Sequence, residues 1–175
     1  METAPKRKSN RLRGFDYSQN AAYFLTICTQ HRKPLFWSVG AHSVRPLTRN
    51  RCDPRGPSLL PALSAEGCIV ERAIWEIPVH YPAVQLVKYA VMPNHVHLLL
   101  LLQGDGRTLC APTVSRVVKH WKEAVTKQLG RSVWQKSFHD HVVRGQADWE
   151  TIWQYIDANP QTWESDCFYL IESTD

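Results

Sequence analysis

The sequence contains no closely spaced cysteine pair and no long apolar run. Its five cysteines are widely separated and form no Cys-x-x-Cys motif, which argues against a disulfide framework and against a cysteine-rich zinc site. No stretch of about 18 apolar residues occurs, so we expect no transmembrane helix. The basic N-terminal segment has no apolar stretch after it, so we expect no secretory signal. A reduced, cytoplasmic protein is the resulting expectation.

Lysine and arginine are absent from residues 145–175, which contain seven acidic side chains. Residues 1–58 show the opposite balance, with 11 basic and three acidic side chains, so the net charge of +5 averages a basic front and an acidic tail. Such asymmetry favours a polyanionic partner, with nucleic acid as the first candidate. A basic arm that only aids solubility is the alternative.

The length of 175 residues corresponds to one domain, or two at most. We interpret residues 1–20 as a basic flexible arm and residues 21–175 as a single domain. Within that domain, residues 38–62 combine four prolines with four arginines. Proline at that density sustains neither a helix nor a central strand, so this segment is predicted to be a loop insertion.

The apolar patterning predicts seven elements in the order β, α, β, β, α, β, α. The first six match the ferredoxin-like split βαβ arrangement, an α+β fold with a four-stranded antiparallel sheet and two helices on one face. The seventh is a C-terminal helix that must dock on this core. The predicted strands are 23–29, 84–92, 95–102 and 138–144, and the predicted helices are 64–80, 113–129 and 147–158.

Two histidines stand at the start of the third predicted strand. Alternation places His95 and His97 on one face, with Val96 and Leu98 on the other. Buried imidazoles need polar partners, and two histidines at this spacing can hold one divalent metal if another ligand comes from elsewhere. A lone His-x-His pair is common, so the spacing alone leaves a structural role open.

The last predicted helix offers two further polar groups. Tyr155 and Asn159 are four residues apart and therefore share one helix face. If that face meets the histidines, the site combines a metal, an amide oxygen ligand and a phenol nucleophile. Phenol is weakly nucleophilic because its pKa is about 10, and a cation that polarises the electrophile offsets part of that weakness. A half-buried Tyr155 and a helix-ending Asn159 are the structural alternatives.

Several segments together resemble the REP-associated tyrosine transposases, which belong to the single-tyrosine HUH transposases of the insertion-sequence type. The match follows the family's order and extends over most of residues 7–166. The segments are RLRGFDYSQ at 11–19, YFLTICTQ at 23–30, YAVMPNHVHLLL at 89–100, WQ at 134–135 with FHDHVVR at 138–144, and YIDANP at 155–160 with Trp163.

This resemblance implies a ferredoxin-like catalytic domain that nicks single-stranded DNA and transfers strands on hairpin or repeat DNA. It implies that His95, His97 and Asn159 hold Mg²⁺ or Mn²⁺ and that Tyr155 forms a 5′-phosphotyrosine intermediate, leaving a free 3′-OH. A non-catalytic nucleic-acid-binding module derived from a transposase is the alternative. A third hypothesis is an unrelated metal-dependent hydrolase that uses His95 and His97 with a water nucleophile.

The charge distribution suggests where DNA would be held. The basic arm and the arginine-rich loop are expected to contact phosphates through salt-dependent interactions. We expect a nucleoid-associated protein, monomeric or homodimeric, whose tyrosine helix acts in its own subunit or in a partner. His139 and His141 are loose candidates for an accessory role or simple surface residues. The expected DNA contacts are Lys6, Arg7, Lys8, Arg11, Arg13, Arg45, Arg49, Arg51 and Arg55.

Overall fold

The computed structural model describes residues 20–38, 62–103 and 113–169. The predicted basic arm, except for its last residue, lies outside these residues, as does nearly all of the predicted insertion at 38–62. All nine expected DNA contacts also fall outside them, so those assignments remain predictions. No helix within the described residues has the length and apolarity that crossing a bilayer requires.

Four antiparallel strands form one sheet in the order β2-β3-β1-β4. With the helices between them, this is the predicted ferredoxin-like arrangement. Each strand falls within two residues of its predicted bounds. The strands are β1 (Ala21–Cys28), β2 (Val84–Val91), β3 (His95–Leu102) and β4 (His139–Val142).

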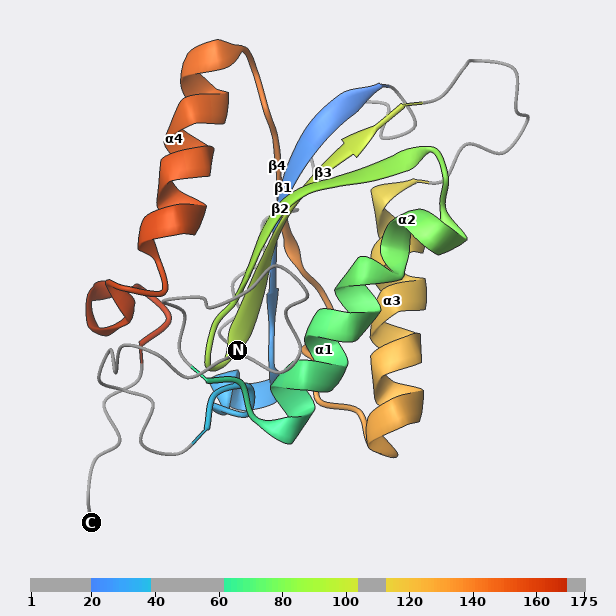
Figure 1. Cartoon of the computed structure of the whole chain (residues 1–175), viewed down its shortest axis with the longest axis vertical. Helices are drawn as coiled ribbons and strands as arrows, with labels where there is room; N and C mark the ends of the chain where they lie inside the picture. Colours follow the sequence, from blue (N-terminus) through green and yellow to red (C-terminus); the bar gives the residue numbers. More distant parts are fainter. Residues whose placement is uncertain (1–19, 39–61, 104–112, 170–175) are drawn as a thin grey trace, which may run out of the picture.

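The helices α1 (Ala65–Trp75) and α3 (Val114–Leu129) pack side by side on one face of the sheet (Figure 1). Each begins at a hydroxyl side chain, because Ser64 and Thr113 accept hydrogen bonds from backbone N–H groups in the first turn. Helix α3 ends at Gly130, whose φ of 67° is the left-handed conformation that closes helices.

The prediction of one continuous helix over residues 64–80 was wrong. The segment divides at Glu76 into α1 and a short α2 (Ile77–His80). Pro78 explains the division, because proline has no amide hydrogen for the carbonyl of residue i−4 and its ring clashes with that carbonyl. Pro78 is accommodated in the first turn of α2, where the missing hydrogen bond is not needed.

The last helix, α4 (Gln146–Ala158), lies on the opposite face of the sheet from α1 and α3 (Figure 1). It packs there through Ile152 and Ile156 against a small apolar cluster that also includes Leu99 of β3. The chain then turns back in a short 3-10 helix, η2 (Trp163–Ser165), whose Trp163 joins the same cluster. Residues after α4 therefore return to the sheet.

The strand β3 is interior and covered on both faces, as predicted. Val96 and Leu98 point into the large apolar core beneath α1 and α3, whereas Leu99 belongs to the cluster beneath α4. Because side chains alternate along a strand, His95 and His97 share the face of Leu99. The fold therefore places both histidines on the side of α4.

Candidate active site

His95 and His97 are fully buried and converge on one point. Their Nε2 atoms lie 2.9 Å apart, and each side chain is no more than 1% exposed. The outer nitrogens are held by neighbours: His95 Nδ1 donates to Asn94 Oδ1 at 2.9 Å, and His97 Nδ1 lies 3.0 Å from Thr26 Oγ1. Such outer contacts orient histidines that bind metal ions, because they leave the inner nitrogens facing the ligand position.

The surroundings keep both imidazoles neutral. Burial lowers the pKa of His95 to about 3, and the positive charge of Arg32 lowers it further. Burial and the neighbouring His95 hold the pKa of His97 well below its usual value. A neutral imidazole is the form that binds metal, so the pair is ready for a cation at neutral pH.

Helix α4 brings Tyr155 and Asn159 to the histidines. Asn159 is 2% exposed, and its Nδ2 lies 3.0 Å from His97 Nε2. Its Oδ1 is buried with no hydrogen-bond partner among the described residues. A half-turn of the amide would exchange these two atoms and present the oxygen to the histidines. A bound cation would satisfy a buried oxygen of this kind.

Tyr155 lies at the open side of this group. Its ring is 5.1 Å from the ring of His97, and its side chain is 39% exposed. The hydroxyl donates to Asp166 Oδ2 at 3.4 Å. Burial and the negative charge of Asp166 raise the pKa of Tyr155 to about 12. The phenol is therefore protonated at neutral pH, with a carboxylate beside it that accepts its hydrogen bond.

Asp166 is the site residue that sequence reasoning missed. It follows η2, and ligand atoms of His95, His97 and Asp166 lie within 4.8 Å of one another. No spacing rule relates Asp166 to α4, because the chain turns at Pro160 before it returns. Two imidazoles, one carboxylate and one amide oxygen form a donor set that fits a divalent metal ion.

A strained turn places a cation beside this group. His31 and Arg32 have φ values of 58° and 55°, a left-handed conformation that non-glycine residues rarely adopt. The guanidinium of Arg32 lies 4.9 Å from the ring centre of Phe168, whose ring is 4.6 Å from His95. Such strain persists only where the surroundings impose it, and it concentrates at functional sites.

Thr29 anchors the strained turn. It is fully buried; its hydroxyl lies 2.8 Å from the carbonyl oxygen of Lys33 and 3.0 Å from that of Asn94. Its backbone N–H also donates to Asn94 at 2.9 Å. The turn is thereby tied to the residue that orients His95.

The two loose histidine candidates lie on β4, and the group of candidate metal ligands includes neither. His139 is exposed and pairs in register with Thr26. His141 Nε2 lies 2.8 Å from Asp148 Oδ2 in the first turn of α4. This contact gives His141 a structural role, because it holds the first turn of α4 next to β4.

Comparison with known proteins relates the chain to a sequence relative and to a solved structure. No protein-family model matches the chain. An uncharacterized protein of Haemophilus influenzae is 24% identical over 185 residues, covering 94% of this chain and 93% of that protein. A REP-associated tyrosine transposase, solved bound to a REP hairpin, superposes with a TM-score of 0.54 at 17% identity, covering 92% of this chain and 74% of that one. At this identity, the likeness shows a shared fold.

Proposed function

We propose that this protein is a metal-dependent, transposase-like enzyme that cuts and rejoins single-stranded DNA with Tyr155 as its nucleophile. The observation that carries the proposal is the meeting of Tyr155 on α4, and of Asn159 at its C-terminal end, with His95 and His97 on β3. Two segments far apart in the sequence supply a nucleophile and a set of ligands to one point. The shared fold with a tyrosine transposase supports the same proposal.

The four donor side chains of His95, His97, Asn159 and Asp166 would hold the cation, with Mg²⁺ or Mn²⁺ as the expected ion. When bound, the ion supplies positive charge that polarises the scissile phosphate. The residues themselves do the positioning. Asn94 and Thr26 fix the two imidazole rings, and Asp166 is itself fixed because its Oδ1 accepts the N–H of Phe168 at 2.7 Å.

The chemical step needs a deprotonated phenol. The proton of Tyr155 passes to the Asp166 carboxylate that already accepts its hydrogen bond. The Tyr155 oxygen attacks phosphorus and forms a 5′-phosphotyrosine, while the bond from phosphorus to the 3′ oxygen breaks. That oxygen takes the proton from Asp166 and leaves as a free 3′-OH, so the Asp166 carboxylate is restored. Attack by a 3′-OH on the phosphotyrosine reverses the sequence and rejoins DNA, so no nucleotide energy source is required.

Hairpin DNA is the proposed substrate, in line with the REP hairpin bound by the structural neighbour. Beside α3, a groove of about 650 Å³ is lined by four lysines, Lys119, Lys122, Lys127 and Lys136. Gln135, which lines the groove, is joined to β1 because its N–H donates to the carbonyl oxygen of Cys28 at 3.0 Å. We propose that this groove holds phosphates together with the arginines of the arm and the loop. An enzyme with this substrate would act at the nucleoid.

The test is a covalent adduct. Purified protein is incubated with a single-stranded hairpin oligonucleotide and Mn²⁺, and adducts are resolved on a denaturing gel. The Tyr155→Phe variant removes one exposed hydroxyl and keeps the ring, so we expect an intact fold and no adduct. Tyr81→Phe is the matched control and should react like the parent. Equal adduct from parent and Tyr155→Phe would refute the nucleophile assignment, and turnover without any adduct would favour a water nucleophile.

A further inference from the structure

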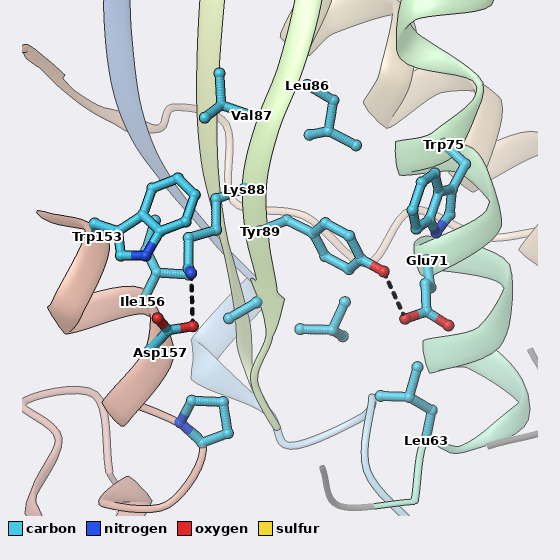
Figure 2. Close-up of a pocket in the computed structure, with 13 residues that line it drawn as sticks. Leu63, Glu71, Trp75, Leu86, Val87, Lys88, Tyr89, Trp153, Ile156 and Asp157 are labelled. Carbon is cyan, nitrogen blue, oxygen red and sulfur yellow. Dashed lines mark hydrogen bonds and ion pairs between the residues drawn. The ribbon is translucent and has the colours of Figure 1, made fainter. Parts of the chain in front are cut away.

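A pocket of about 390 Å³ opens over the outer edge of β2, with which no strand of the described residues pairs, between α1 and α4 (Figure 2). Edge strands are usually protected by charge, proline or a covering element, and here the edge is left at the floor of a hollow. The volume falls in the range of small-ligand sites. None of the roles assigned above to the active-site residues uses this pocket.

The walls of the pocket are aromatic. Figure 2 shows Trp75 from α1 and Trp153 from α4 on opposite sides of β2, with Tyr89 between them. The two tryptophans are 37% and 38% exposed, large apolar surfaces left to solvent. Trp75 stands edge-on to Tyr89, with ring centres 5.6 Å apart. Rings at such positions offer stacking surfaces to a flat partner.

The polar groups in the pocket are acidic in balance. Tyr89 donates to Glu71 Oε1 at 3.0 Å. Lys88 is the one basic residue among the described residues that line the pocket. Its ammonium lies 2.6 Å from Asp157 and 3.8 Å from the ring centre of Trp153, so its charge is already matched. Two carboxylates against one ammonium repel a phosphate and favour a neutral, flat group that donates hydrogen bonds.

We propose that this pocket takes one unpaired nucleobase with an exocyclic amino group, from the same DNA strand that Tyr155 attacks; this rests on the proposed function. Trp75 stacks on the base, and the Glu71 carboxylate accepts from its amino group, as acidic side chains do with cytosine. Adenine, cytosine and guanine each carry an exocyclic amino group, whereas thymine has none, so thymine is disfavoured.

The pocket and the active site share the end of α4. Asn159 faces the histidines, and its neighbour Pro160 lines the pocket. Trp153 and Asp157 lie two residues before and after Tyr155 on the same helix, on the pocket side. A single strand that passes the C-terminal end of α4 therefore reaches both places.

The test couples one base to one side chain. Hairpin oligonucleotides carry an abasic site at each position of the unpaired flank in turn, and affinity is measured by fluorescence anisotropy. With the parent protein, one position should lose roughly 5- to 100-fold in affinity, the range of base–aromatic stacking. With Trp75→Ala, the same abasic site should cause little further loss. Additive losses at every position would overturn the proposal.

Two variants serve as checks. Glu71→Gln keeps the size of the side chain and should narrow the preference at that position for adenine, cytosine or guanine over thymine; an unchanged preference counts against the contact with Glu71. Val79→Ala, a 75% exposed apolar position on α2, should change nothing. Binding is measured without cleavage, so the two proposals are tested separately. If Trp75 shows no coupling to any base, the adduct assay still tests Tyr155. If no adduct forms, the coupling between Trp75 and the base can still be measured.

Discussion

The two faces of the sheet are built from the same strands and differ in what they bury. Beneath α1 and α3, residues from all four strands join one large apolar core, with Tyr23, Leu98 and Val125 fully enclosed. Beneath α4, the apolar cluster is small and sits next to buried polar residues, among them His95, His97 and Asn159.

The two faces therefore differ in role: one provides most of the stability of the fold, and the other holds the candidate active-site residues. Apolar burial stabilises a fold roughly in proportion to area, so the α1 and α3 face contributes most of the folding free energy. Buried polar groups stabilise little unless they are fully partnered. The α4 face can keep a neutral histidine pair and an unsatisfied amide oxygen because the other face holds the domain together.

The largest expected effect is on the chemistry of the α4 face. His97→Ala should lower DNA cleavage by about a thousandfold or more, as removal of central catalytic groups does. It should also abolish stabilisation by metal, which for the parent is about 2.7 kcal/mol at a metal concentration 100 times Kd. Thermal unfolding with and without Mn²⁺ measures this. His139→Ala, an exposed histidine on β4, is the control, and equal metal stabilisation of His97→Ala would contradict the site.

A pair of equal truncations compares the two faces directly. Ile74→Ala, in the large core, should lower the free energy of unfolding by about 3–5 kcal/mol, because it leaves a cavity where the structure cannot collapse. Ile152→Ala, beneath α4, should cost nearer 2 kcal/mol and should reduce adduct formation more per unit of stability lost. Urea unfolding and adduct rates measure both, and a larger stability loss at Ile152 would reverse the comparison.

We expect the strained turn at His31 and Arg32 to lower the stability of the fold and to support its activity. Arg32→Gly removes the strain and the cation together, so it should gain about 1 kcal/mol of stability and weaken DNA cleavage. His31→Gly relieves a similar strain and keeps Arg32, so it should gain stability without losing cleavage. Thermal unfolding and adduct rates distinguish the two variants. If both lose activity equally, the backbone conformation matters rather than the guanidinium.

The smallest effect concerns the attachment of α4 to β4. Hydrogen bonds from the N–H of Arg144 and from His141 hold the pKa of Asp148 below its ordinary value of 3.8. The ionised carboxylate therefore stabilises the fold above that value, and this stability is lost as the pH falls through the lowered pKa. Asp148→Asn should cost at most about 1 kcal/mol at pH 7 because solvent screens the contacts. Unfolding curves of variant and parent should converge at acidic pH, once the Asp148 carboxyl is protonated in both the folded and the unfolded state.

Local patterns in the sequence predicted the architecture well. The order of elements, the alternation along β3 and the shared helix face of Tyr155 and Asn159 depend on periodicity, which neighbouring residues determine. The break at Pro78 was also within reach, since proline inside a helical pattern ends or kinks the helix. The sheet order then followed from the known arrangement of such elements.

The rest depends on tertiary contacts that spacing does not encode. Which face of the sheet α4 covers follows from its packing against Leu99 and β2. Asp166 reaches the site only because the chain turns after Pro160. The left-handed conformations of His31 and Arg32 have no sequence signal, because they are imposed by Thr29 and its partners.

The connection between β4 and α4 contains Gly145, whose φ of 88° and ψ of 179° are open to glycine almost alone. A β-carbon there would meet no atom within 4 Å, so only the backbone conformation opposes substitution. Replacing Gly145 would therefore leave α4 helical and change the direction in which it departs from the sheet. The backbone of a single glycine therefore sets the line along which α4 leaves the sheet, and with it the position of Tyr155 beside His97.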